Sequence, residues 1–431
     1  MNNIVLKSLL AENFASFADR VVFTTEVDAS KKEYPENIFP MGDDFFNRVT
    51  FIYGANGSGK TFFCKILREI QRLLDWSPIM AVNNAQLLSQ FKGMDTIVPT
   101  FVYDVSYQDK PTSLGIDLVI DEITYHYEFS IQNKKIISEL LTKKYRRTEK
   151  LLERTSSSFK DISLRSELKS FEDNLRVVKE EALCLPMAAF LNNSLASILV
   201  EAIRSINVLN MTAARLAPTN SQESFSEERI SKYIQVLQKA DPTLRKLNVS
   251  VEEEETTRQR IDSDDFENRE IIATKTTLAI QAEHAVYDQN KETSRASIDF
   301  FHDESLGTVK LFSVLPHLFD VLEDGGALIV DEIENGLHLS IVKDIIRLFI
   351  DPKSNPYCAQ LICTSHQPLL VSGNIRRDQV WVACKDNYGK SSLRRMSKMS
   401  TSRAKVNITN RLLDGAFGCN PEPFFGDPQE G

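Results

Sequence analysis

The chain has 431 residues, with 51 Lys and Arg against 60 Asp and Glu and a formal net charge of −9. This length gives room for two or three lobes with a sizeable core, and the 42% of hydrophobic residues excludes disorder as the main state. The acidic balance argues against a protein that acts mainly by electrostatic binding of nucleic acid, although a local basic patch would still allow such contact. Neither a membrane span nor a signal peptide is evident, so we expect a cytoplasmic protein without a membrane partner.

The strongest local pattern is a glycine-rich stretch between a strand and a helix. Residues 49–53 form an apolar, β-branched run that predicts a buried strand, and residues 62–76 carry apolar side chains at helical spacing. The stretch between them lets the backbone curl so that its N–H groups point at phosphate oxygens, and the helix N-terminus adds positive charge. We expect Lys60 to reach the β- and γ-phosphates and the Thr61 hydroxyl to ligate Mg²⁺. The predicted phosphate-binding residues of this Walker A loop are Gly54, Asn56, Gly57, Ser58, Gly59, Lys60 and Thr61.

The middle of the chain predicts a β-meander and then a largely helical region. Residues 100–107, 114–120 and 124–131 alternate or run apolar, as strands of a meander do, and residues 136–145 could continue it. Residues 146–247 favour helices, exposed at first and then packed. The strongly acidic stretch 252–268 predicts a mobile loop, with a surface for a partner protein as the alternative.

Three further patterns carry chemistry in the last third of the chain. The apolar run 327–330 leads directly into Asp331 and Glu332, which places both carboxylates at the carboxyl edge of a sheet. We expect Asp331 to hold Mg²⁺ and Glu332 to polarise the attacking water. His366 follows another apolar run and could donate a hydrogen bond to the γ-phosphate.

The segment E-S-L-G-T, residues 304–308, precedes a predicted helix and is called the signature segment below. Ser305 and Gly307 at a helix N-terminus could form an anion site from the first, unpaired N–H groups. An ordinary capped helix start explains the same residues, and chemistry alone leaves both interpretations open.

Strands and helices alternate at both ends of the chain, so the predicted fold class is α/β, with one nucleotide-binding P-loop head split by a β-meander and a helical insertion. Residues 1–135 would form the N-terminal half of the head with Walker A and the meander. Residues 136–270 would form a mainly helical insertion, and residues 271–431 the C-terminal half of the head.

The ordered set of motifs resembles the ABC-type ATPase heads of SMC and RecF proteins. This resemblance implies that ATP and Mg²⁺ are the cofactors and that Lys60, Glu332 and His366 take part in hydrolysis. Residues 334–338 resemble the D-loop, and His366 resembles the switch histidine. Ser305 and Gly307 would act on ATP held by a partner subunit, so that two heads enclose the nucleotide.

More closely, the chain resembles the AAA-type ATP-binding proteins of bacterial abortive-infection systems of the AbiLi and RloA kind. The segments that carry this resemblance include N-F-A-S-F (13–17), Y-G-A-N-G-S-G-K-T, M-A-A-F-L-N-N (187–193), E-S-L-G-T-V-K-L-F and D-E-I-E-N-G-L-H. It implies an ATP-hydrolysing sensor or scaffold of an anti-phage defence system that forms homo-oligomers through its heads. It would control a separately encoded effector, such as a TOPRIM-like or HNH nuclease, in response to a phage-encoded trigger. The stretch after His366 is short and lacks an acid triad, so we expect no nuclease activity from this chain alone.

Two positions depart from the pattern of these heads. Such heads usually have Arg or Lys where Ala15 stands here, and Arg20 is the candidate replacement; no Q-loop glutamine is assigned. A repair-type head that holds DNA is the alternative, and it would use a basic cluster at residues 143–150. A solvated face is the favoured interpretation of that cluster, and salt-dependent DNA binding would support the alternative.

Overall fold

The computed structural model describes residues 4–28, 30–81, 98–212, 225–260, 269–399 and 408–413, with the backbone alone for 251–260 and 269–278. The chain divides into two compact units. The first, here called the head unit, is Met1–Thr212 with Phe319–Gly431, and the second, the ribbon unit, is Ala213–Leu318. Each unit is described by itself.

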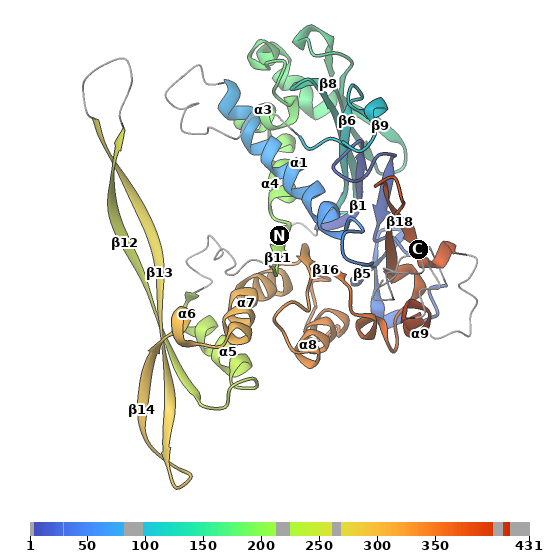
Figure 1. Ribbon diagram of the computed structural model, residues 1–431. Coiled ribbons are helices and arrows are strands. Elements are labelled where there is room, and N and C mark those ends of the chain that lie inside the picture. The colour runs from blue at the N-terminus through green and yellow to red at the C-terminus, as the bar shows by residue number, and fades with distance from the viewer. Residues whose placement is uncertain are drawn as a thin grey trace, which may run out of the picture. The chain divides into compact units, whose positions relative to one another are not determined.

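A six-stranded sheet forms the centre of the head unit, in the order β11-β15-β16-β5-β17-β18 (Figure 1). The first five of these strands are parallel and β18 pairs antiparallel with β17. Every residue of β5, β15 and β16 is buried, as expected for parallel strands covered on both faces, and this explains their unbroken apolar runs. The bounds are β5 Val49–Tyr53, β11 Asn207–Asn210, β15 Ala327–Asp331, β16 Gln360–Ser365, β17 Val380–Lys385 and β18 Ser391–Arg395.

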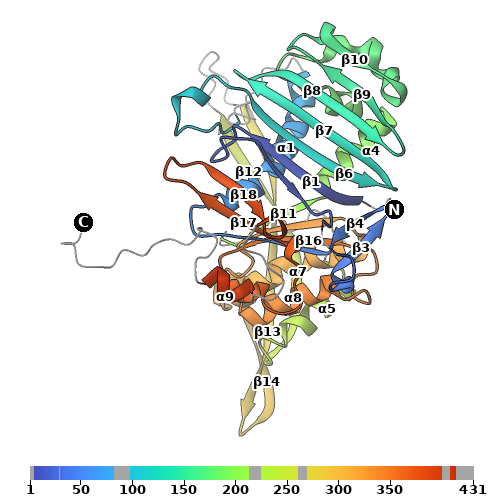
Figure 2. The same cartoon turned by 90° about the vertical axis from the view of Figure 1, so that its right-hand side faces the viewer.

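A seven-stranded antiparallel sheet is the second layer of the head unit, in the order β10-β9-β8-β7-β6-β1-β2 (Figure 2). Residues of β7 alternate between buried and partly exposed, so one face of the sheet packs on the core. The predicted meander is confirmed for β6 and β7, and its possible continuation is β8. The strand predicted at 100–107 is wrong, because this stretch forms no strand and ends in a 3-10 turn at Val105–Tyr107. The bounds are β1 Ile4–Glu12, β2 Val21–Thr24, β6 Thr112–Ile120, β7 Ile123–Gln132, β8 Lys135–Lys144, β9 Thr148–Arg154 and β10 Ile162–Leu164.

Helices cover the sheets of the head unit. The long helix α1 (Lys60–Ala81) contacts α3 (Cys184–Phe190) and α4 (Ser194–Arg204), which lie beside it in Figure 1. One apolar core joins α1 to the inner strands of both sheets, and burial of this kind stabilises a fold by about 25 cal/mol for each Å² of apolar surface. The remaining strands and α-helices described in the head unit are β3 Ile38–Met41, β4 Asp44–Asn47, α8 Leu339–Ile350 and α9 Ile408–Leu413.

Within the described ranges, no single helix is long and apolar enough to cross a membrane. The pair α3 and α4 passes the same test of length and composition only when taken together, and the two helices are bent by 110° at the break between them. The predicted cytoplasmic location stays a prediction.

The ribbon unit consists of helices and one three-stranded antiparallel sheet in the order β12-β13-β14. The two long strands β12 and β13 extend well beyond the helices of this unit in Figure 1. Helix α7 begins in the ribbon unit and ends in the head unit. The bounds are α5 Glu227–Leu237, β12 Leu244–Arg260, β13 Arg269–Asp288, β14 Lys291–Asp299, α6 Phe300–Asp303 and α7 Leu306–Asp324.

The loop predicted for the acidic stretch 252–268 is wrong up to Arg260, which ends β12. Residues Glu252 to Arg260 pair in continuous register with β13, for example Glu252 opposite Thr277 and Glu255 opposite Thr274. The partner strand is rich in Ile and Thr over residues 271–277, and such β-branched residues favour a strand over the local charge pattern. Residues 261–268 lie outside the described ranges.

The structure divides the chain at other points than the predicted boundaries of 135 and 270. Strands β8, β9 and β10, within the insertion predicted to be mainly helical, belong to the seven-stranded sheet of the head unit. Glu139 and Arg154 in this region are buried. Charged residues at buried positions hide the alternation of apolar and polar residues that predicts a strand. Both oxygens of Glu139 accept hydrogen bonds, from Tyr127 and from the N–H groups of Cys184 and Leu185.

The predicted α/β fold class is confirmed. The glycine-rich loop lies between β5 and α1, and Asp331 ends the parallel strand β15. The six-stranded sheet is assembled from both ends of the chain, since β5 pairs with β16 and β17 across more than 300 residues of sequence.

His126 makes one pH-dependent contribution to the stability of the head unit. Its Nδ1 lies 2.6 Å from Asp117 Oδ1 and its Nε2 lies 3.3 Å from Glu128 Oε2. These contacts, with Asp117 first, raise the pKa of His126 from 6.5 to about 9. The folded state therefore favours the protonated ring, and this stabilisation is complete below pH 6.5 and lost as the pH rises through about 9.

We expect the free energy of unfolding to fall by about 1–2 kcal/mol over this pH range, a figure discounted for the partial exposure of the ring. Urea unfolding of the wild type at pH 6.5 and at pH 9 measures the change. The variant His126→Gln should show a smaller difference between the two pH values. An equal difference in both proteins would contradict this assignment.

Candidate nucleotide-binding site

The Walker A loop runs from the end of β5 to the start of α1, and two of its glycines are required by close packing. Gly59 has φ of +108°, and a Cβ atom there would lie 2.6 Å from Ser391 Oγ and 3.0 Å from Ser16 Oγ. A Cβ atom on Gly54 would lie 2.5 Å from the main-chain oxygen of Ala383. No larger residue fits either position without displacement of the β17–β18 hairpin.

Lys60 is only 5% exposed, and its ammonium group lies inside this loop. Its Nζ donates to the main-chain oxygens of Gly54 at 2.7 Å and Ala55 at 2.8 Å. Burial lowers the pKa of Lys60, and the nearby carboxylates of Glu332, Glu334 and Asp331 oppose this effect. The lysine is thus held in the concave side of the loop, close to the acids that follow β15.

Asp331, at the end of β15, is 1% exposed and has a partner that the sequence analysis did not identify. Thr364 Oγ1 donates to Asp331 Oδ1 at 2.6 Å and accepts the N–H of Glu332 at 2.8 Å. Cys64 on α1 also contacts Asp331, and burial, reinforced by this carboxylate, raises the pKa of the Cys64 thiol. Asp331 is therefore fixed from the neighbouring strand and from the Walker A helix.

Glu332 lies in the turn after β15, and its backbone has φ of +54°. Non-glycine residues rarely adopt this left-handed conformation, which costs of order 1 kcal/mol. The side chain is partly exposed, and its Oε2 accepts a hydrogen bond from Asn335 Nδ2 at 3.2 Å. The turn directs this carboxylate away from the regular path of the strand while Asn335 orients it.

His366 follows β16 and is exposed, and Glu334 positions it. The Glu334 Oε1 atom accepts the backbone N–H of His366 at 2.8 Å and the Ser365 hydroxyl at 2.9 Å, and it lies 3.0 Å from His366 Nδ1. Glu334 therefore fixes the start of the turn that carries the histidine. Nε2 is the ring nitrogen that remains for a contact outside this pair.

The predicted residues of the head unit converge because three parallel strands are neighbours. Strand β16 lies between β15 and β5, with Val330 opposite Cys363 and Ser365 opposite Tyr53. The carboxyl ends of these strands meet at one edge of the sheet, which is where ligands bind in open α/β folds. This edge carries Lys60, Thr61, Asp331, Glu332 and His366.

The donor set of this edge fits a nucleotide triphosphate with Mg²⁺. The Thr61 hydroxyl and the Asp331 carboxylate are oxygen ligands of the kind that Mg²⁺ prefers. The first N–H groups of the 22-residue helix α1 have no partner within the helix, and Lys60 supplies a buried positive charge beside them. Asn56 and Gly57 are exposed at the tip of the loop, and Ser58 is buried beneath it.

Ser305 and Gly307 lie in the ribbon unit, at the start of the 19-residue helix α7. The Ser305 hydroxyl accepts the N–H of Thr308 at 3.1 Å and lies 2.8 Å from the Thr308 hydroxyl, so Ser305 caps the helix. Ser305 is exposed. Ser305 thus forms the ordinary helix cap that the sequence allowed. The role of the signature segment at a partner's nucleotide stays a prediction.

Arg20 is engaged elsewhere and does not take the place of a basic residue at Ala15. Its guanidinium donates to both carboxylate oxygens of Glu128, at 2.8 and 2.9 Å. Ala15 is 8% exposed with φ of +51°, and its N–H donates to the main-chain oxygen of Pro99.

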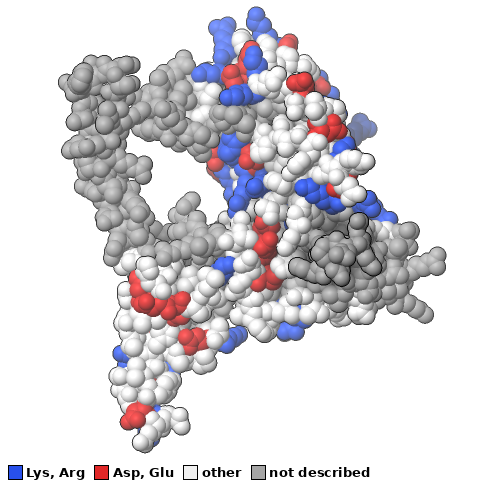
Figure 3. Space-filling model, in the orientation of Figure 1, with Lys and Arg blue, Asp and Glu red and all other residues white. Residues whose placement is uncertain are grey.

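The basic cluster at residues 143–150 is partly neutralised by acids. Lys143 pairs with Glu149 and Glu167, and Lys150 pairs with Glu153. Figure 3 shows Lys and Arg atoms interspersed with Asp and Glu atoms over the upper part of the visible face. These contacts favour a solvated, charge-paired face over a dedicated surface for DNA.

Comparison with known proteins gives the family. Residues 49–372 match the family described as "AAA domain, putative AbiEii toxin, Type IV TA system". The chain belongs to this family, and the resemblance to AAA-type ATPases of abortive-infection systems is confirmed at that level. No curated protein matches the sequence.

Three solved structures of SMC heads are similar to this chain. The SMC head bound to the C-terminal winged-helix domain of ScpA has 13% identity and a TM-score of 0.44, with 90% of this chain and 97% of that chain covered. The SMC head domain from Thermotoga maritima has 11% identity and a TM-score of 0.32, with 90% and 98% covered. The Smc head domain with coiled coil and joint derived from Pyrococcus yayanosii has 11% identity and a TM-score of 0.42, with 96% and 100% covered.

The bond between Thr364 and Asp331 leads to a prediction with a matched control on the next strand. We expect Thr364→Val to slow ATP hydrolysis about tenfold, because Asp331 loses its donor and the Glu332 N–H loses its acceptor. The control is Thr50→Val on β5, since the Thr50 hydroxyl is equally buried but has no hydrogen-bond partner among the described residues. Equal hydrolysis rates for the two variants would show that Thr364 does not position the acids.

Proposed function

We propose that this chain is an ATP-binding and ATP-hydrolysing sensor or scaffold subunit of a bacterial anti-phage defence system. The observation that carries this proposal is the gathering of Lys60, Asp331, Glu332 and His366 at one edge of the six-stranded sheet. The description of the matching family, which names a putative AbiEii toxin and a type IV toxin–antitoxin system, supports a role in defence.

Within this proposal, the Walker A loop and Lys60 bind the phosphates of ATP, and Thr61 and Asp331 hold Mg²⁺. Bound Mg²⁺ would neutralise negative charge on the β- and γ-phosphates. Glu332, oriented by Asn335, accepts a proton from the attacking water. His366, fixed by Glu334, contacts the γ-phosphate from the neighbouring strand end.

Two heads would form a dimer around ATP, with the signature segment of one chain completing the site of the other. Support comes from the order of the motifs and from Ser305, which is exposed at the N-terminus of the long helix α7. A helix start of this kind attracts an anion such as the γ-phosphate. ATP-driven dimerisation would then be the two-state element that a defence switch requires.

The output of the switch would be a separately encoded effector that the dimer holds or releases. The resemblance to abortive-infection proteins suggests a TOPRIM-like or HNH nuclease as this effector and a phage-encoded molecule as the trigger. In this proposal the chain itself has no nuclease activity.

The experiment that tests the proposal is light scattering of the purified chain with and without ATP and Mg²⁺, alone and with the products of neighbouring genes. A nucleotide-dependent dimer or larger oligomer that binds a neighbouring gene product supports the proposal and identifies the effector. A chain that dimerises on ATP, ignores these products and binds DNA in a salt-dependent manner would instead support a repair-type head.

A further inference from the structure

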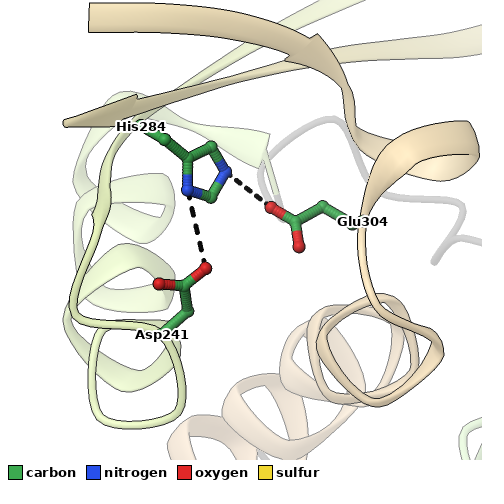
Figure 4. Close-up of side chains that lie close together, drawn as sticks. All are labelled: Asp241, His284 and Glu304. Carbon is green, nitrogen blue, oxygen red and sulfur yellow. Dashed lines mark ion pairs between the residues drawn. The ribbon is translucent and has the colours of Figure 1, made fainter. Parts of the chain in front are cut away.

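His284 on β13 lies between two carboxylates within the ribbon unit (Figure 4). Its Nε2 is 2.6 Å from Glu304 Oε1, and its Nδ1 is 2.9 Å from Thr243 Oγ1 and 3.5 Å from Asp241 Oδ2. The side chain of Glu304 is only 6% exposed and that of His284 is 15% exposed. The histidine therefore joins three parts of the unit: the turn after α5, strand β13 and the end of α6.

The arrangement is that of a bridging side chain rather than a metal centre. The two carboxylates lie at different ring nitrogens, on opposite sides of the imidazole (Figure 4). An ion bound through one nitrogen would face one carboxylate and leave the other behind the ring. The 2.6 Å separation of Nε2 and Glu304 Oε1 is the length of a direct polar contact.

Each partner of this contact depends on the other. His284 Nε2 and Glu304 Oε1 are both buried, and neither has a well-aligned hydrogen bond to any described residue. Removal of one side chain would leave a buried polar atom of the other without compensation, which is costly in a protein interior.

Glu304 is the first residue of the signature segment, and it also contacts the next residue, Ser305. Its second carboxylate oxygen, Oε2, accepts the N–H of Ser305 at 3.2 Å. Ser305 in turn caps α7 through the N–H of Thr308. One carboxylate thus faces β13 on one side and holds the first residue of the helix cap on the other.

We propose that His284 is a positioning residue that fixes the signature segment, acting through Glu304 on Ser305 and the N-terminus of α7. This inference rests on the proposed function, in which the signature completes the ATP site of a second copy of the chain. Loss of the contact leaves ATP binding to Lys60 of the same chain intact. It lowers the rate of hydrolysis at the partner's site, because Ser305 no longer has a fixed position.

Two substitutions at this position separate the contact to Glu304 from the rest of the side chain. The amide nitrogen of Gln can reach the place of Nε2 and contact Glu304, whereas that of Asn can reach only the place of Nδ1, on the side of Thr243 and Asp241. For His284→Asn we expect kcat for ATP to fall about tenfold with KM changed less than about twofold. His284→Gln should recover most of the rate, and His126→Gln is the matched control in the head unit.

A mixing experiment places the effect at the signature. A chain with Lys60→Ala keeps an intact signature, and a chain with His284→Asn keeps an intact Walker A loop. In a mixed dimer, one of the two sites combines the intact Walker A loop with the intact signature segment. About half of the dimers in an equal mixture are mixed, so the mixture should hydrolyse ATP at about a quarter of the wild-type rate.

The results distinguish this inference from the proposed function. If the wild type neither dimerises on ATP nor hydrolyses it, the proposed function fails. If the wild type does both, the inference is overturned by any of three results: wild-type kcat for His284→Asn, equal loss in the Asn and Gln variants, or no recovery in the mixture.

Discussion

The variant Glu332→Gln is expected to lose ATP hydrolysis by about 10²- to 10³-fold while it still binds ATP. The amide keeps the size and shape of the side chain and its place beside Asn335, but it cannot accept a proton from water. In the proposed mechanism, ATP hydrolysis lets the ATP-bound dimer dissociate. The variant should therefore accumulate as a dimer in ATP and Mg²⁺. Phosphate release and light scattering on the same sample measure the two effects.

The control for Glu332→Gln is Asp344→Asn on α8, an exposed carboxylate that pairs with Arg347. This substitution should leave both the rate and the dimer unchanged, since exposed pairs of this kind contribute little. Wild-type turnover in Glu332→Gln would show that another group activates the water. Lost turnover without ATP-bound dimers would instead remove dimerisation from the proposed mechanism.

The variant Lys60→Ala is expected to weaken ATP binding about a hundredfold, because the phosphates lose their one buried ammonium contact from this loop. It should also lower the stability of the nucleotide-free protein. Lys60 is the positive charge among Asp331, Glu332 and Glu334, and without it these carboxylates repel one another. Added Mg²⁺ should restore part of the lost stability by binding between the acids.

Isothermal titration with ATP and thermal unfolding with and without Mg²⁺ measure these effects. Lys65→Ala is the matched control, since Lys65 lies on the same helix and is exposed. It should bind ATP like the wild type and unfold at nearly the same temperature. If the two lysine variants bind ATP equally well, Lys60 does not hold the phosphates.

The chemistry of the head could be predicted from the sequence because its motifs are short and follow apolar strands. A single contiguous stretch carries the Walker A loop, and Asp331 and Glu332 directly follow four buried residues. The pattern of one strand, however, does not say which strand lies beside it. The role of Thr364 does not follow from the sequence, since it depends on β16 lying next to β15.

The middle of the chain was harder to predict because charge there does not follow exposure. Glu139 is 1% exposed and Arg154 is 2% exposed, each with main-chain hydrogen bonds that compensate for burial. A charged residue in the sequence indicates a solvent-facing position, and the charged stretch that holds β9 therefore predicts an exposed helix. The acidic composition of residues 252–260 predicts a loop, but their pairing with β13 outweighs that composition and makes them part of strand β12.

The resting position of Lys60 has a consequence for selectivity among phosphate compounds. A ligand that enters the loop must take the ammonium away from the two carbonyl oxygens that hold it at 2.7 and 2.8 Å. A nucleoside triphosphate carries more negative charge than inorganic phosphate and can replace both contacts at once. We therefore expect inorganic phosphate to bind this loop more weakly than a nucleoside triphosphate does.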